Sequence, residues 1–80
     1  MNDPALIRRI NAARTIPLGI YRDAGCDDRF DYLDWLAQDH GVDLDVVITI
    51  AALLGPEEDF DGLACAVEDA AQGFGIGADR

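Results

Sequence analysis

The sequence predicts a small, mostly α-helical bundle of about four helices. The chain has 80 residues, the length of one small domain. Its apolar residues recur at helical spacings of three and four over most of that length, and glycine or proline interrupts the pattern between segments. We therefore expect a single helical domain over residues 1–72, followed by a flexible glycine-rich tail over residues 73–80.

The first helix is predicted at about residues 4–14. Asp3 precedes Pro4, which is the arrangement of an N-cap followed by proline at the first helical position. Leu6 and Ile10 belong to an apolar stripe, with arginines on the opposite side. The pattern ends at a proline-containing segment, so the helix ends before it.

The segment near residues 16–21 has two interpretations. Ile16, Leu18 and Ile20 alternate with other residues, which favours a short strand. The proline and glycine within the same segment favour a turn or loop. The sequence leaves both open.

Two helices are predicted next, at about residues 28–40 and 44–54, with Gly41 as the stop between them. The capping residues are Asp27 or Asp28 for the first of these helices and Asp43 for the second. The segment 44–54 is apolar on nearly every face, which is typical of a central core helix or an interface helix. Its β-branched first half also fits a strand, but its Ala-Ala-Leu-Leu end and the glycine stop favour a helix.

The last helix is predicted at about residues 57–72. Phe60, Leu63 and Val67 share the face that would point inward.

The charge is strongly negative and unevenly distributed. The chain has six arginines and sixteen aspartates and glutamates, which gives a net charge of −10. Residues 1–22 hold four of the arginines and one acid, whereas residues 23–80 hold two arginines and fifteen acids. An acidic field repels nucleic acid and anionic membrane and attracts basic surfaces. This distribution has two explanations, which are compatible with each other. The basic first helix could lie across the acidic residues 23–80 and offset their mutual repulsion, and the acidic residues could form a docking surface for a partner.

The composition leaves little material for catalysis. The chain contains no serine and no lysine, which excludes a serine nucleophile, a Schiff-base lysine and a phosphate-binding P-loop lysine. His40 is the only imidazole, and Cys26 and Cys65, the only thiols, lie in no catalytic or zinc-binding spacing. We expect no catalytic residue, no cofactor and no metal site, and therefore a non-enzymatic protein. Cys26 and Cys65 could form a disulfide, although two cysteines in a reducing cytosol are more often free.

One stretch has the spacing of a calcium-binding EF-hand loop. The residues at loop positions 1, 3, 5, 6 and 12 are Glu57, Asp59, Asp61, Gly62 and Glu68. The first ligand is usually aspartate, and Ala64 stands where a bulky aliphatic residue is usual. A helix beginning at Asp61 explains the same residues without metal, and we favour it.

The stretch over residues 36–50 resembles the helix-turn-helix of bacterial DNA-binding proteins. The matching positions are the small Ala37, the turn glycine Gly41 and the aliphatic Val42, Val47 and Ile50. In that family the second helix presents basic or amide side chains to DNA. Here it begins Asp43-Leu44-Asp45 and carries no basic residue, so the resemblance implies the geometry without DNA binding.

Eleven carboxylates form three acidic patches, which are the candidate partner-binding residues. The first patch is Asp27, Asp28, Asp31 and Asp34; the second is Asp39, Asp43 and Asp45; the third is Glu57, Glu58, Asp59 and Asp61. Acidic residues stabilise helix N-termini, which explains individual members. Neighbouring carboxylates also repel one another, so their total number indicates a role in binding.

In size and charge the chain is similar to the phage-encoded acidic DNA mimics, including many anti-CRISPR proteins. That resemblance implies a cytoplasmic inhibitor, acting in a bacterial host cell, that binds a basic nucleic-acid-binding protein or complex such as a CRISPR effector complex. The inhibitor would block nucleic-acid binding by charge mimicry and steric occlusion.

A second hypothesis is that the protein is an oligomerisation or adaptor module with the shape of a helix-turn-helix. Such a module could be an antitoxin-like regulatory protein. It would bind through the apolar helix at 44–54 and the aromatic residues Tyr32, Trp35 and Phe74. A homodimer is compatible with either hypothesis.

Overall fold

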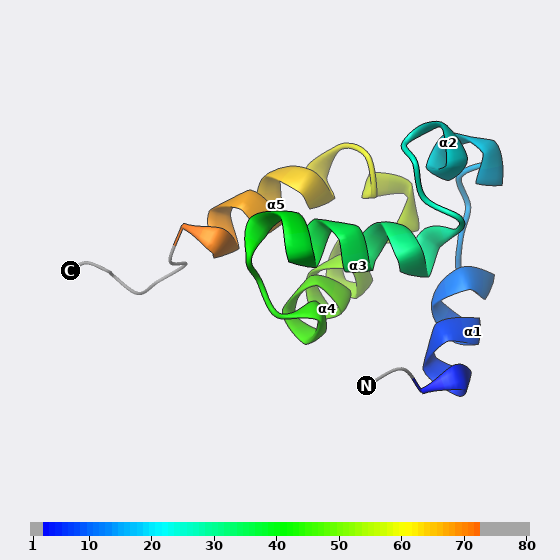
Figure 1. The fold of residues 1–80 in the computed structure, drawn as a ribbon, viewed down its shortest axis with the longest axis horizontal. Helices are drawn as coiled ribbons and strands as arrows, with labels where there is room; N and C mark the ends of the chain where they lie inside the picture. Colours follow the sequence, from blue (N-terminus) through cyan, green and yellow to red (C-terminus); the bar gives the residue numbers. More distant parts are fainter. Residues whose placement is uncertain (1–2, 73–80) are drawn as a thin grey trace.

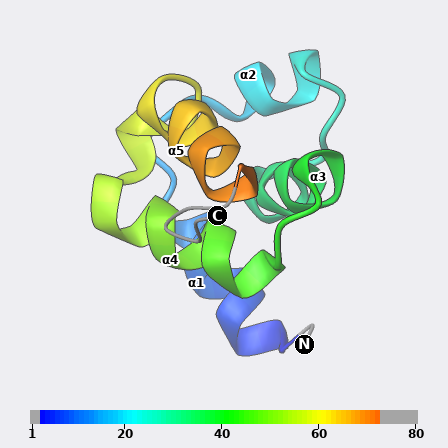
Figure 2. The same ribbon diagram turned by 90° about the vertical axis from the view of Figure 1, so that its left-hand side faces the viewer.

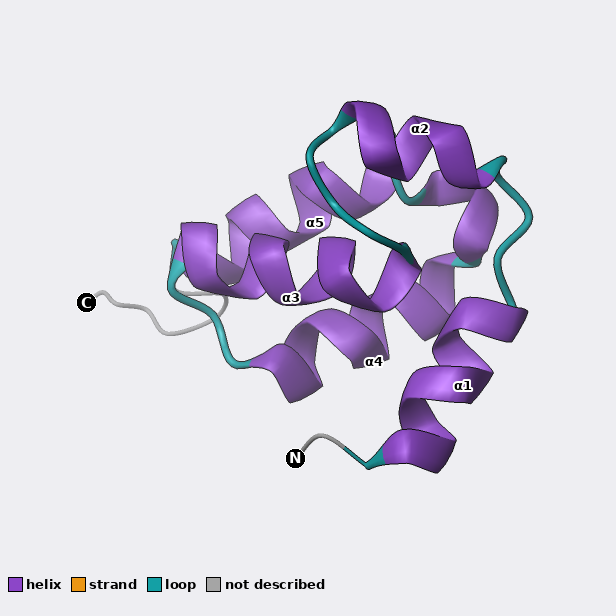
Figure 3. Ribbon diagram, turned by 45° about the vertical axis from the view of Figure 1, so that its right-hand side comes forward, coloured by secondary structure: helices purple, strands orange, loops and turns teal. Residues whose placement is uncertain are grey.

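The computed structural model describes residues 3–72, and every regular element within them is helical (Figures 1 and 3). The elements are α1 (Pro4–Ala12), α2 (Leu18–Asp23), α3 (Arg29–His40), α4 (Leu44–Leu54), the short 3-10 helix η1 (Pro56–Glu58) and α5 (Gly62–Ala71). The prediction of a small helical bundle is confirmed. The predicted glycine-rich tail at 73–80 lies outside the described residues.

Three helices form the body of the molecule. Helices α3, α4 and α5 each pack against the other two, while α1 and α2 both pack on α3. Figure 1 shows α1 and α2 at the end of the body where α3 begins, and in the end-on view of Figure 2 α2 lies at the top and α1 at the bottom. No helix within residues 3–72 is long and apolar enough to cross a membrane.

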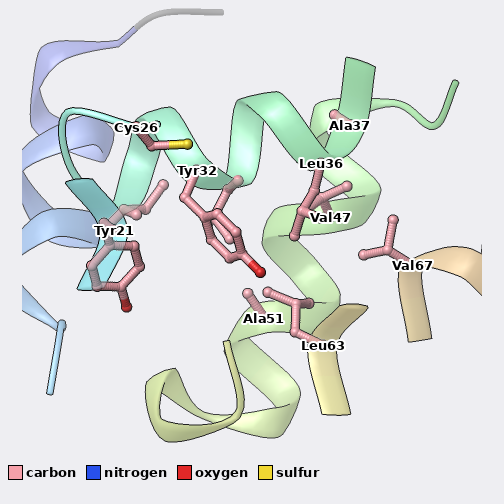
Figure 4. Close-up of a cluster of buried hydrophobic side chains, with 11 residues drawn as sticks. Tyr21, Cys26, Tyr32, Leu36, Ala37, Val47, Ala51, Leu63 and Val67 are labelled. Atoms are coloured by element: carbon pink, nitrogen blue, oxygen red, sulfur yellow. The ribbon is translucent and has the colours of Figure 1, made fainter. Parts of the chain in front are cut away.

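The core lies between these elements (Figure 4). Its most deeply buried side chains come from four helices and are Tyr21, Leu33, Leu36, Val47, Leu63 and Val67. Leu33, Leu36 and Ala37 are buried on one face of α3, which follows the three- and four-residue spacing of the sequence. Helix α3 is therefore the element against which the others are placed.

The segment near 16–21 contains neither a strand nor a simple loop, because residues 18–23 form α2. Pro17 is its N-cap, a position at which the missing proline N–H is harmless. The buried side chain is Tyr21, and Leu18 is partly buried, so the apolar spacing is three. Ile20, which completes the apparent alternation, is exposed.

The last helix does not begin at residue 57; it begins at the alternative start that the calcium-loop pattern indicated, with Asp61 as its N-cap. Residues 56–58 form η1, a turn follows, and α5 starts at Gly62. The turn occurs because Asp59 points into the core and is held there by side chains of α2 and α3. Phe60, predicted to be inward, keeps 37% of its surface exposed.

The connection between α3 and α4 has the expected geometry. Gly41 adopts the left-handed conformation at φ 67° and ψ 34°, and the Val42 N–H donates back to the Ala37 carbonyl at 2.9 Å. Asp43 occupies the N-cap of α4, but its side chain makes no capping hydrogen bond. The helix–turn–helix path is thus set by Gly41.

Candidate acidic docking surface

Ten of the eleven predicted carboxylates reach the surface. Six are exposed, namely Asp27, Asp39, Asp43, Asp45, Glu57 and Asp61, and four are half-buried, namely Asp28, Asp31, Asp34 and Glu58. The remaining one, Asp59, is fully buried. The three patches lie at the start of α3, at the α3–α4 turn and between α4 and α5, so they are distributed over the molecule rather than gathered in one place.

The first patch is ordered by neutral hydrogen-bond donors. Asp28 caps α3, accepting from the Asp31 N–H at 2.9 Å, and its second oxygen accepts from the Asn11 amide at 3.2 Å. Asp31 accepts from the Asp27 N–H at 2.8 Å, and Asp34 accepts from the Gln38 amide at 2.9 Å. These bonds fix the orientation of the carboxylates without neutralising their charge.

The second and third patches have fewer internal contacts. Asp39 lies 3.8 Å from the His40 ring, and Glu58 accepts from the Gly62 N–H at 3.2 Å. Asp43, Asp45 and Glu57 extend into solvent. Their charges remain available to a partner.

Asp59 corrects the predicted third patch. Its Oδ2 accepts from Arg29 Nε at 2.7 Å and from the Tyr21 hydroxyl at 2.6 Å, and its Oδ1 accepts from Arg29 Nη2 at 3.1 Å. The Tyr32 hydroxyl donates to the Asp59 carbonyl at 2.8 Å, and Arg29 Nη1 donates to the Ile10 carbonyl at 3.2 Å. Asp59 is therefore a core residue that joins α2, α3 and the α4–α5 connection.

Both tyrosines of this network are held in the neutral form. Burial, followed by the hydrogen bond to Asp59, raises the pKa of Tyr21 well above its ordinary value of 10.0. Burial, followed by the charge of Asp59, raises the pKa of Tyr32 to about 12. Each hydroxyl therefore acts as a hydrogen-bond donor at neutral pH.

This ion pair was not predicted from the sequence, although one signal for it is present there. Arg29 lies on the same face of α3 as Leu33 and Leu36, at spacings of four and seven residues. A charged residue on an apolar face requires a buried partner of opposite charge. The partner itself, 30 residues away, follows from the tertiary fold alone.

The basic first helix does not neutralise the patches by contact. Two ion pairs occur within residues 3–72, namely Arg29–Asp59 and His40–Asp39. Arg8 and Arg9 of α1 are exposed, and Arg14 donates to the Ile16 carbonyl at 2.7 Å. Within residues 3–72, the arginines of α1 therefore do not offset the repulsion between the carboxylates by forming ion pairs with them.

The apolar helix α4 is only partly covered. Val47 and Ala51 are buried, whereas Leu53 is 81% and Leu54 40% exposed. Between α1 and α4 lies an open, mainly apolar groove of about 360 Å³, whose lining includes Leu6, Ile10, Ile48, Ala52, Pro56 and Arg9. Helix α4, with its exposed end and this groove, is the second candidate binding surface.

The cysteines are unpaired. Cys65 is exposed, and Cys26 is buried. Burial, followed by the charges of Asp31, Asp27 and Asp28, raises the pKa of the Cys26 thiol, which makes it a poor nucleophile. In the described part of the chain no three metal-ligating side chains converge, and Asp59, the third position of the calcium-loop pattern, is bound to a guanidinium instead.

Comparison with family models, with curated proteins and with solved structures finds no match to this chain.

Proposed function

We propose that this protein is a non-enzymatic acidic inhibitor that docks on a basic nucleic-acid-binding protein or complex, such as a CRISPR effector complex. It would occlude the surface on which the partner holds phosphates. The observation that carries this proposal is the placement of charge: ten of the eleven patch carboxylates reach solvent, while the eleventh is neutralised internally by Arg29.

The proposed mechanism is competition for basic side chains. Arginines and lysines that hold phosphates form charge-assisted hydrogen bonds with carboxylates as well. The first patch is suited to this role because Asp28, Asp31 and Asp34 are already oriented by hydrogen bonds, which lowers the entropy lost on binding. The long-range field of the remaining acids would accelerate the encounter.

The test uses charge reversal in each patch separately. The variants keep Asp28 and Asp31, which hold the start of α3, and replace pairs of other acids by lysine: Asp27 with Asp34, Asp43 with Asp45, and Glu57 with Asp61. The matched control, Glu68→Lys with Asp69→Lys, makes the same charge change outside the patches on α5.

The measurement is nucleic-acid binding by a panel of purified basic complexes, including a CRISPR effector complex, with and without this protein. We expect inhibition of at least one complex, weakening steeply with salt, and lost in one patch variant but kept in the control. Absence of inhibition across the panel, or equal inhibition by all variants, would overturn the proposal.

The exposed end of α4 supports a second candidate, the adaptor that binds through an apolar face. Ile50 packs against the core, so Leu53 is the better probe. Under this hypothesis Leu53→Gln abolishes partner binding, and salt has little effect on it because apolar contacts are not screened.

A further inference from the structure

Trp35 is a half-exposed aromatic residue with a rigid support. Its ring stacks on Tyr32, with centroids 6.2 Å apart and an interplanar angle of 22°. Tyr32 in turn stacks on Phe60 at 4.4 Å and 26°, and its hydroxyl is fixed by the Asp59 carbonyl. Trp35 nevertheless exposes 48% of its surface, so one end of a three-ring stack faces solvent.

Carboxylates flank this ring along the helix. Asp31 precedes Trp35 by one turn of α3 and Asp39 follows it by one turn. Residues four apart on a helix are neighbours on its surface. One Asp31 oxygen accepts from the Asp27 N–H, and no donor within residues 3–72 reaches the other. Asp39 is exposed, with one oxygen 3.8 Å from the His40 ring.

A half-exposed indole with a carboxylate residue one helical turn away in each direction matches one side chain in particular. The planar guanidinium of arginine stacks on an aromatic ring and donates to a carboxylate in the same plane, whereas the lysine ammonium is a compact, strongly hydrated point charge. Arginine and tryptophan are also the residues that dominate binding at interfaces. The net charge of −10 favours a cationic occupant over an apolar one.

We propose that Trp35, with Asp31 and Asp39, forms a subsite for an arginine side chain of the basic partner. This inference rests on the proposed function and names its anchor: the indole supplies specificity for arginine, while the surrounding patches supply the salt-dependent attraction. Tyr32 and Phe60 are positioning residues, because they hold the indole in place.

The test uses short peptides of defined chemistry as probes. A fluorescein-labelled oligoarginine and an oligolysine of the same length are titrated with the protein at constant, low ionic strength, and binding is followed by anisotropy. We expect the wild type to prefer oligoarginine. Trp35→Leu should weaken oligoarginine binding by about two- to fivefold, the factor that corresponds to an exposed cation–π contact, and leave oligolysine binding nearly unchanged.

Two controls locate the effect. Leu53→Ala truncates a more exposed apolar side chain elsewhere and should change neither affinity. Asp31→Asn with Asp39→Asn should reduce the preference for arginine, whereas Asp43→Asn with Asp45→Asn, which removes the same charge elsewhere on the surface, should weaken both peptides alike. Because Trp35 is the only tryptophan, its fluorescence should change on oligoarginine binding in the wild type.

The outcomes separate this inference from the proposed function. Equal affinity for the two peptides, or a Trp35→Leu variant that binds oligoarginine as the wild type does, overturns the arginine subsite and leaves the acidic docking surface standing. Failure of both peptides to bind at low ionic strength overturns both proposals.

Discussion

Asp59 and Arg29 show what one buried pair of charges does in a domain of this size. Both side chains are nearly inaccessible. The Asp59 carboxylate accepts a hydrogen bond from the Tyr21 hydroxyl, and the Arg29 guanidinium donates to the Ile10 carbonyl of α1. The Asp59 backbone carbonyl accepts from the Tyr32 hydroxyl. A buried ion pair adds little net stability compared with a well-packed apolar pair, because both charges lose their hydration. Removing one partner is costly, since the other charge then remains buried without compensation.

We therefore expect Asp59→Asn to lower the free energy of unfolding by about 3–5 kcal/mol. Asparagine preserves the shape but leaves the Arg29 guanidinium unpaired. The measurement is urea unfolding followed by far-ultraviolet circular dichroism. The control is Asp61→Asn, an exposed neighbour, for which we expect a change within about 0.5 kcal/mol; similar losses in the two variants would show that Asp59 is not a special position.

The tyrosines of the same network predict an alkaline limit of stability. Above pH 10 a tyrosine in the unfolded chain loses its proton, while Tyr32 in the folded protein, whose pKa is raised to about 12, keeps it. Unfolding then releases a proton, so the free energy of unfolding falls by up to about 1.4 kcal/mol per pH unit for each such tyrosine. Below pH 10 both states keep the proton and this contribution is constant.

Urea unfolding at a series of pH values between neutrality and pH 11 measures this dependence. Tyr32→Phe removes one ionisable group and should flatten the decline above pH 10. A decline as steep as that of the wild type would assign the effect to other groups.

At the scale of the elements, alanine substitutions at two glycines should change the stability in opposite directions. Gly41 ends α3 at a positive φ of 67°, whereas Gly19 lies within α2 with no atom near the position of an added Cβ. We expect Gly41→Ala to destabilise the protein by about 1–2 kcal/mol, because alanine resists the left-handed conformation. Gly19→Ala should stabilise it by about 0.5–1 kcal/mol.

Thermal or urea unfolding of the two variants checks this pair of expectations. The result for Gly19 also bears on the segment whose sequence was ambiguous, since a loop that holds this glycine at positive φ would make the substitution destabilising. Destabilisation by Gly19→Ala would contradict the assignment of α2.

The elements that the sequence predicted well are those with local signals. The bounds of α4 agree with the prediction, and those of α3 differ from it by one residue, because a capping aspartate and a stop glycine bracket each helix. Helix α2 was not predicted, because its identity depends on burying Tyr21 beside Asp59, 38 residues away. The start at residue 57 was wrong for the same reason, whereas the start at Asp61 is confirmed.

The candidate surface was predictable to a similar extent. Polarity alone places most carboxylates outside, so ten of the eleven were located correctly at the surface. The exception, Asp59, lies inside a run of acids that looks uniform in sequence, and its position follows from a distant arginine. The support beneath Trp35 likewise depends on Phe60 from another part of the chain.

At the scale of the whole molecule, the charge distribution sets the conditions under which the fold is stable. A net charge of −10 on 80 residues opposes compaction by self-repulsion. Salt screens exposed charges strongly, with a Debye length of about 8 Å at physiological ionic strength against about 30 Å at 0.01 M. We therefore expect the melting temperature to rise with added sodium chloride, whereas binding to a basic partner weakens under the same change.

The position of each charge along its helix separates self-repulsion from local effects. Glu68 and Asp69 are exposed near the C-terminus of α5, where the helix dipole disfavours negative charge, whereas Asp43 and Asp45 are exposed at the start of α4, where it is favoured. Glu68→Gln with Asp69→Asn should therefore raise the melting temperature at low salt more than Asp43→Asn with Asp45→Asn, and both pairs should reduce its dependence on salt. A melting temperature that is independent of salt, in the wild type and in both pairs, would show that self-repulsion does not limit the stability of this fold. The acidic residues would then not destabilise the protein, and their number would no longer be an argument for a role in binding.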